Sequence, residues 1–267
     1  MSLFDWILRL LDEYGESFLN GTRNTLIMAL AGTIIGFLIG LIIAIIRTIP
    51  TTKNTNIVLK IFLKVINFIL NAYVEIIRGT PMLVQAIILY YSIFVPMGIH
   101  DIGAKVLGEG IVSAIIIISF NTGAYMAEIV RGGIMSIDKG QFEGAHSIGM
   151  NHFQTMLYII LPQATRNIMP QIGNNLIINI KDTCVLSVIG TVELFFATKS
   201  VAGTYYTFFE AYTITMVMYL CMTVFFSKLL RIVENKLNGP EDYSLSTTDT
   251  LAYTSGLLKY PSKKEVE

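Results

Sequence analysis

Long apolar runs alternate with short charged segments along the chain. A helix needs roughly 20 apolar residues to span about 30 Å of hydrocarbon. The clearest run, 24–46, has no charged residue and ends at Arg47. Two further runs cover 110–127, before Glu128, and 211–227, before Lys228. These runs predict three membrane-spanning helices.

Two other stretches predict spans once their polar residues are considered. Between 57 and 78, polar residues recur every three or four positions and therefore share one helical face: Lys60, Lys64, Asn67, Asn71, Glu75 and Arg78. Together with the apolar run 81–96, this amphipathic segment predicts one long spanning element kinked at Gly79–Pro81. The run 156–180 contains two prolines and one arginine, but it is long enough to cross a membrane as a helix.

The distribution of basic residues predicts the orientation. Lys and Arg are dense in 47–78, 131–166 and 228–267 and sparse between these segments. Such residues mark the cytoplasmic side, so the amino terminus is expected outside and the carboxyl terminus inside, which requires an odd number of spans. We expect an all-α, polytopic transmembrane helical bundle of about five spans, near residues 22–47, 57–96, 110–131, 155–181 and 207–233.

These spans define a transmembrane domain over residues 1–238. The loop 138–154 is then cytoplasmic. Residues 239–267 are polar and rich in Ser and Thr, which predicts a flexible cytoplasmic tail.

Three glycines in the first run lie four residues apart. Gly32, Gly36 and Gly40 form a small-xxx-small face that allows close approach of another helix. Five helices without an internal inverted repeat make a thin wall around a solute path, so we expect a dimer, which this glycine face could support.

Composition excludes several function classes. Hydrophobic residues make up 53% of the chain and charged residues 14%, and 19 basic residues balance 19 acidic ones. A nucleic-acid binder needs a cationic excess. The sequence contains no GxxxxGK[ST] or HExxH motif and no convincing pair of nucleophile and base. We therefore expect no catalysis, no metal site and no cofactor in this chain.

The loop GQFEGAHSIGMNHFQTMLYIILP, residues 140–162, combines helical character with apolar surface. It resembles the shared loop of membrane permeases of bacterial ATP-binding-cassette (ABC) importers, with a departure at Gly144, where the family favours Ala. The matching residues are Glu143, Ala145, Gly149, Ile159, Leu161 and Pro162. The stretches YVEIIRGTPMLVQ (73–85), AYMAEIVRGGI (124–134) and KDT (181–183) resemble the polar amino acid uptake group, the histidine, glutamine and arginine type of permease.

The resemblance implies a type I importer permease fold in the bacterial cytoplasmic (inner) membrane. It implies a cytoplasmic ABC ATPase dimer that binds ATP and Mg²⁺, an extracytoplasmic substrate-binding protein, a second permease copy or paralogue, and an amino acid substrate. The loop helix would dock on the ATPase, with Glu143 pairing in a groove and with Ala145 and Gly149 small enough to seat the helix. The expected coupling residues are Gly140, Glu143, Ala145, Gly149 and Pro162.

Polar groups on the third and fourth spans are candidates for the translocation path: Asn121, Tyr125, Glu128, Asn174, Asn175, Asn179, Lys181 and Asp182. For any single Asn, an interhelical hydrogen bond is the alternative. Glu128 and Arg131 could instead be anchors or a structural ion pair. The helix-break motif comprises Arg78, Gly79, Thr80 and Pro81, with Arg78 as an anchor. A non-transporting membrane scaffold or receptor for a cytoplasmic partner is the alternative function.

Overall fold

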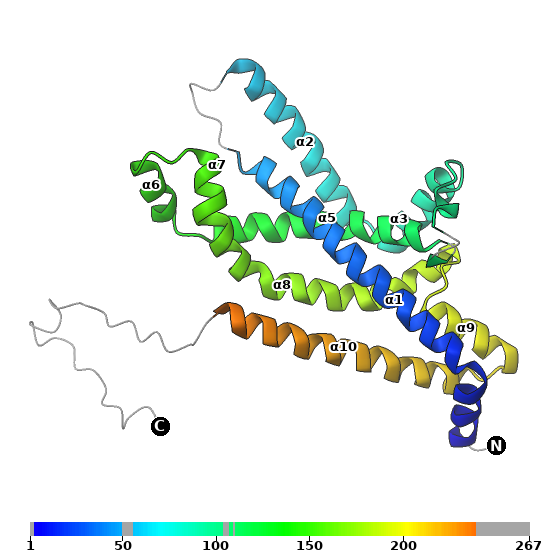
Figure 1. Cartoon of the computed structure of the whole chain (residues 1–267). Coiled ribbons are helices and arrows are strands. Elements are labelled where there is room, and N and C mark those ends of the chain that lie inside the picture. The colour runs from blue at the N-terminus through cyan, green and yellow to red at the C-terminus, as the bar shows by residue number, and fades with distance from the viewer. Residues whose placement is uncertain (1–2, 50–55, 104–106, 109, 239–267) are drawn as a thin grey trace, which may run out of the picture.

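The structure, a computed structural model, describes residues 3–49, 56–103, 107–108 and 110–238, and these form helices and connecting turns without any strand (Figure 1). The expected tail 239–267 lies outside the described residues. The α-helices are α1 (Leu3–Arg47), α2 (Ile57–Gly79), α3 (Met82–Leu89), α5 (Ile111–Met135), α6 (Lys139–Ser147), α7 (His152–Thr155), α8 (Leu161–Asp182), α9 (Leu194–Tyr205) and α10 (Phe208–Asn238). Short π-helical segments, Tyr90–Phe94 and Met156–Ile160, and 3₁₀ segments, Ile99–Asp101 and Thr183–Ile189, connect some of them.

Four helices of the described residues are long and apolar enough to cross a membrane, namely α1, α2, α5 and α10. A fifth span results if His152–Ile189 and Leu194–Tyr205, bent by 56° at a short break, count as one. These findings confirm an all-α polytopic bundle. The stretch 57–96 differs from the single kinked span of the sequence analysis, because α2 alone is long enough to cross and Met82–Phe94 is a separate, shorter apolar segment.

The centre of the bundle is the packing of α1 along α5. Each of the three glycines of the small-xxx-small face faces one α5 side chain, and these partners are also four residues apart: Gly32 faces Ile118, Gly36 faces Thr122 and Gly40 faces Met126. The small-xxx-small face is thus covered by another helix of the same chain. A second copy would have to use a different surface.

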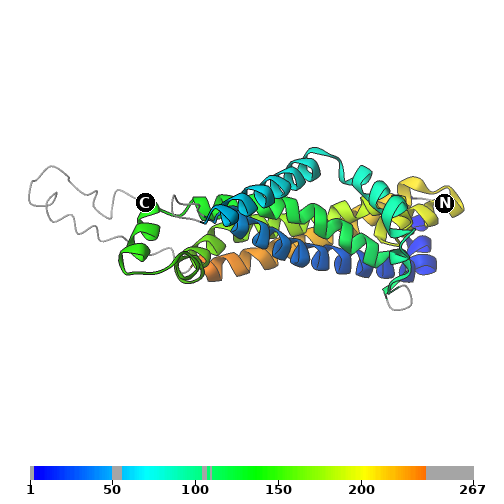
Figure 2. The same ribbon diagram turned by 90° about the horizontal axis from the view of Figure 1, so that it is seen from above.

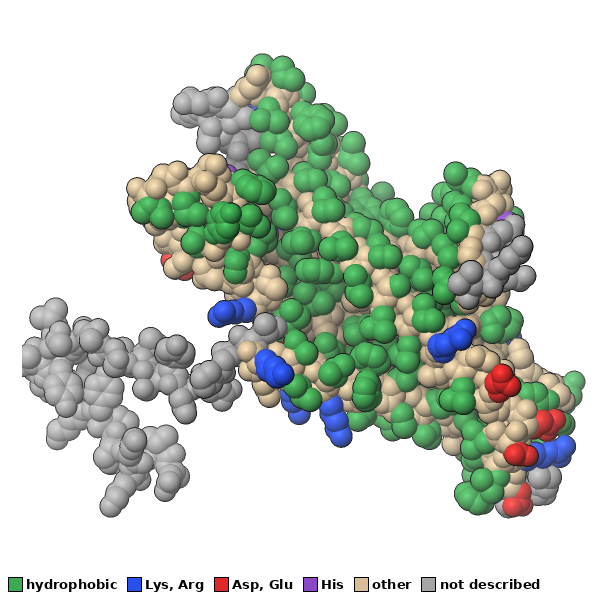
Figure 3. Space-filling view, viewed as in Figure 1, with side chains coloured by type: hydrophobic (Ala, Val, Ile, Leu, Met, Phe, Trp, Pro, Cys, Tyr) green, Lys and Arg blue, Asp and Glu red, His purple; other side chains and the backbone are tan. Residues whose placement is uncertain are grey.

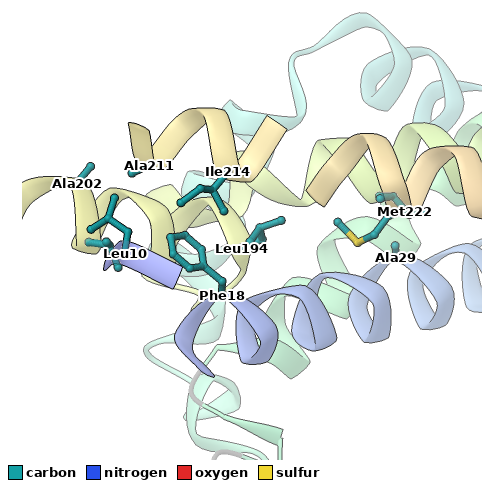
Figure 4. Packing of buried hydrophobic residues seen from close by; sticks show 10 residues of the cluster. Leu10, Phe18, Ala29, Leu194, Ala202, Ala211, Ile214 and Met222 are labelled. Atoms are coloured by element: carbon teal, nitrogen blue, oxygen red, sulfur yellow. The ribbon is translucent and has the colours of Figure 1, made fainter. Parts of the chain in front are cut away.

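α1 begins about 20 residues before its apolar run and is 45 residues long, or about 68 Å at 1.5 Å per residue. Its first part packs against α9 and α10 in a cluster that includes Leu10, Phe18, Leu194 and Ile214 (Figure 4). α9 has no counterpart among the expected spans. The buried Glu193 caps it by accepting hydrogen bonds from the backbone N–H groups that begin the helix.

The surface of the bundle is largely apolar. Hydrophobic side chains cover its middle, whereas charged side chains gather towards its two ends, with acidic ones near the start of α1 (Figure 3). α2 lies on one side of the bundle, where it contacts mainly α5 (Figure 2), and most of its hydrophobic side chains are exposed. A soluble protein would not expose so large an apolar surface.

Candidate functional site

The break between α2 and α3 has a clear chemical cause. Pro81 has no N–H group, so the carbonyl of Ile77 loses its normal helical donor four residues on. Thr80 is extended, with φ −124° and ψ 146°. Its hydroxyl donates to the Ile76 carbonyl at 2.8 Å. The chain therefore leaves α2 at Gly79 and starts α3 in a new direction.

Gln85, which the sequence analysis did not select, supplies the donor that Pro81 lacks. Its Nε2 atom lies 2.7 Å from the Ile77 carbonyl oxygen, 2.9 Å from the Thr80 carbonyl oxygen and 2.9 Å from Thr80 Oγ1. Its Oε1 atom accepts a hydrogen bond from Asn121 Nδ2 on α5 at 3.0 Å. The Gln85 side chain is buried. The signal in the sequence was a polar residue inside an otherwise apolar run, since a buried amide needs partners.

A cavity of about 340 Å³ lies beside this break, and we call it the α2–α3 cavity. It is lined by Thr80, Pro81, Met82, Asn121, Tyr125, Asn175, Ile178, Asn179 and Asp182. Five of the eight path candidates therefore meet around one space, together with two residues of the helix break. Asn121 and Tyr125 are about 15 and 21 Å along α5 from its start, close to the middle of this 25-residue helix.

A positive charge lies at the edge of the α2–α3 cavity. The Arg78 guanidinium carbon is 5.6 Å from the ring centroid of Tyr125, which lines the cavity. This is the distance of a cation–π contact. The side chain predicted as an anchor of the helix break is therefore also a neighbour of the cavity.

Asn179 joins α8 to two other helices by hydrogen bonds and also lines the α2–α3 cavity. Its Nδ2 atom donates to Thr33 Oγ1 on α1 at 2.8 Å and to Thr122 Oγ1 on α5 at 2.9 Å. Only 4% of Asn179 is exposed. Its geometry matches the interhelical hydrogen bond that was the alternative for an Asn in a span.

Three path candidates lie away from this cavity. Asn174 is exposed and does not line it. Lys181 lines a different cavity of α8, with Cys184 and Tyr219. Glu128 lies nearer the carboxyl-terminal end of α5, where it pairs with two arginines.

The Glu128 ion pairs connect α1 and α5. Arg47 Nη1 lies 2.5 Å from Glu128 Oε1, and Arg131 Nη2 lies 2.8 Å from Glu128 Oε2. Both arginines and the carboxylate are at least partly buried. The structure places Glu128 in the structural ion pair that was the alternative to a path role.

The loop after α5 contains the short helix α6, which Asp138 caps by accepting from the Gly140 N–H group at 2.7 Å. Glu143 and Gly144 are exposed, and so is Ile148, by 76%. Ala145 is only 5% exposed and faces the rest of the chain. Burial inside this chain gives one reason for its small side chain, and the expected fit into a partner groove stays a prediction.

Gly149 follows α6 instead of belonging to it. Its φ of +81° is in the left-handed region, which favours glycine, and a Cβ atom there would meet nothing within 4 Å. Backbone conformation therefore gives a second reason for a glycine at 149. Pro162 is exposed in the first turn of α8, directly after the π-helical segment Met156–Ile160.

Comparisons with known proteins identify the family. Residues 57–239 match the family model described as "Binding-protein-dependent transport system inner membrane component", and the chain belongs to this family. It is 35% identical over 173 residues to the "Glutamine transport system permease protein GlnP" of Escherichia coli strain K12, which covers 65% of this chain and 76% of the relative. The "Putative glutamine transport system permease protein GlnP" of Rickettsia typhi is 36% identical over the same shares.

Solved structures agree with this assignment. The "Crystal structure of an amino acid ABC transporter with histidines" matches with a TM-score of 0.69 and 34% identity over 84% of this chain and 95% of that chain. An inward-facing structure of the MetNI methionine ABC transporter matches with a TM-score of 0.62 at 15% identity over 82% of this chain and 95% of that chain, and so shows the shared fold. The chain is thus a multi-pass permease of an ABC importer in the inner membrane, as the resemblance implied.

Proposed function

We propose that this permease forms the translocation path for a polar amino acid and that the α2–α3 cavity is where the substrate is held during transport. The cavity itself is the observation that carries the proposal. Its volume of about 340 Å³ is in the range of small-molecule sites, and a few polar groups converge on it from α5 and α8.

The chemistry of the cavity suits a zwitterion. Asp182 and the amide oxygens of its asparagines can accept hydrogen bonds from an ammonium group. Arg78, at the Tyr125 edge, can pair with a carboxylate. Relatives whose names give glutamine, and the solved transporter described with histidines, support an amino acid as the substrate of this chain.

The energy for transport would come from partners. In the proposal, a separate cytoplasmic ABC ATPase dimer binds ATP and Mg²⁺ and pushes on the loop 138–154, whose exposed residues include Glu143, Gly144 and Ile148. A binding protein outside delivers the substrate, and a second permease copy or paralogue completes the path. The basic segments then face the cytoplasm, with the amino terminus outside and the carboxyl terminus inside.

Adjacent asparagines on α8 provide a matched test. Asn175 lines the cavity, whereas Asn174 is exposed and does not. Permease, ATPase and binding protein would be reconstituted in liposomes without ion gradients, and uptake of labelled glutamine and histidine would be measured with and without ATP. We expect ATP-dependent uptake by the natural chain and by Asn174→Leu, and a loss of at least tenfold in Asn175→Leu. Absence of uptake by the natural chain would support a scaffold instead, and equal uptake by both variants would remove the cavity from the path.

A further inference from the structure

The hydrogen bonds at the helix break determine the orientation of the Gln85 amide. Two of the groups near one end of this amide are backbone carbonyls, those of Ile77 and Thr80, at 2.7 and 2.9 Å. Carbonyl oxygens only accept hydrogen bonds, so the NH₂ group of Gln85 must face them. Its oxygen, Oε1, must then face α5.

The same argument extends to the next amide. Gln85 Oε1 only accepts, and its partner on α5 is the amide of Asn121 at 3.0 Å. Asn121 must therefore present its NH₂ group to Gln85. An amide has its oxygen on the opposite side of the carbonyl carbon from this nitrogen, and Asn121 Oδ1 has no hydrogen-bond partner among the described residues. Asn121 also lines the α2–α3 cavity, whereas Gln85 does not.

We propose that Gln85 is a positioning residue that holds Asn121 with its Oδ1 atom towards the α2–α3 cavity. Beside Asn121, the cavity then selects a hydrogen-bond donor of the ligand, namely the α-ammonium group of an amino acid. The inference rests on the proposed function and deepens it. It assigns the ammonium end of the substrate to the side of Asn121 and Asp182, and the carboxylate end to the side of Arg78.

A positioning residue is needed because an asparagine amide by itself has no preferred polarity. Rotation by 180° about its last torsion exchanges donor and acceptor in almost the same volume. A free Asn121 could then offer its NH₂ group to the cavity and accept ligands that lack an ammonium group. Because Pro81 lacks an N–H group, the Gln85 amide bonds to the Ile77 carbonyl, and Gln85 in turn orients the Asn121 amide of α5. The helix break thus affects which ligands the α2–α3 cavity accepts.

The test compares ligand pairs that differ only in the ammonium group. Binding of L-glutamine and of 4-carbamoylbutanoate, and of L-histidine and of imidazolepropionate, would be measured with the purified permease–ATPase complex in the absence of the binding protein. A hydrogen bond to a charged group is strong enough to make the preference for the amino acid about tenfold or more. We expect Gln85→Met to narrow this preference about tenfold, and Gln171→Met, an exposed position of α8, to leave it unchanged.

Gln85→Glu separates positioning from folding. A protonated carboxyl group has one donor and one acceptor, so it can donate to the Ile77 or Thr80 carbonyl and accept from Asn121, whereas the carboxylate can only accept. Both forms accept from the Asn121 NH₂ group, so Gln85→Glu should keep the preference that Gln85→Met narrows, at any pH at which the complex stays folded. Asn121→Leu, which removes the acceptor directly, should narrow the preference even if Gln85→Met fails to fold.

The outcomes distinguish the two proposals. Failure of the natural complex to bind any of the amino acids would overturn the proposed function and this inference with it. An undiminished preference in Asn121→Leu or in a folded Gln85→Met, or a preference in Gln85→Glu as narrow as in Gln85→Met, would overturn the role of Gln85 alone.

Discussion

Gly36 of α1 and Thr122 of α5 are in direct contact: a Cβ atom added to Gly36 would lie 2.6 Å from the Thr122 Cβ atom. The Thr122 hydroxyl in turn accepts a hydrogen bond from Asn179 of α8. The absence of a side chain at Gly36 therefore lets three helices meet beside the α2–α3 cavity.

Gly36→Ala should destabilise the permease. The added methyl group must displace Thr122, and overpacking of this kind costs about 1–3 kcal/mol. Gly15→Ala is the matched control, since it lies in the same helix with nothing within 4 Å of a new Cβ atom. It should be neutral or stabilising, because Ala is favoured over Gly in helices by up to about 1 kcal/mol. Thermal unfolding of the purified protein in detergent measures both. Equal midpoints for the two variants would contradict the observed packing.

Asn179→Leu should reduce stability by about 1 kcal/mol, the range of interhelical hydrogen bonds in membranes. The change removes the bonds to Thr33 and Thr122 at 2.8 and 2.9 Å. Asn175→Leu, in the same helix, should leave the unfolding midpoint nearly unchanged while it reduces uptake. If the two variants lost the same stability, the hydrogen bonds of Asn179 would not be what stabilises the contact between the helices.

Glu128→Gln should also lower the unfolding midpoint. It removes the negative charge between Arg47 and Arg131, whose side chains are 15% and 35% exposed. We expect a loss of about 1–2 kcal/mol, since the pairs are only partly buried and hydrogen bonds to charged groups contribute about 1.5–3 kcal/mol. Glu75→Gln, at an exposed position of α2, is the control and should have no effect. Such a loss should shrink as salt is added, and a loss independent of salt would argue against an ion pair.

A glycine at position 149, in the loop after α6, has two possible reasons: its left-handed backbone conformation, or docking on the ATPase. Substitutions at this position separate them. With φ at +81°, Asn should be tolerated better than Ala, because Asn adopts left-handed conformations more readily. If docking on the ATPase demands a small residue, Ala should instead be tolerated better than Asn. Co-purification of the ATPase with Gly149→Ala and Gly149→Asn decides between backbone strain and docking.

The choice of control for this loop follows from its geometry. Gly140 is unsuitable, because a Cβ atom there would lie 2.7 Å from Asp138 Oδ1, which caps α6. Gly144→Ala is suitable, since Gly144 is exposed with nothing within 4 Å. It should strengthen α6 and leave the ATPase bound.

The residue pattern alone was enough for the class of the fold and for much of the candidate site. Runs of about 20 apolar residues predict spanning helices because the hydrocarbon core offers no partner for free backbone groups. Polar residues within such runs are costly, so Asn121, Asn175 and Asp182 could be selected by residue type and position. Pro81 and Gly79 likewise indicated a break in the chain.

Only the tertiary structure decided which of these residues face the cavity and which join helices. A helical period shows that residues share a face, but not which helix covers that face. The period therefore could not reveal the covering of Gly36 by α5, the burial of Ala145 within its own chain or the pairing of Glu128 with Arg47. Gln85 shows the same limit at the site. The loss of a donor at Pro81 is visible in the sequence, but the side chain that replaces it, and its bond to Asn121 36 residues further on, depend on how α3 turns back against α5.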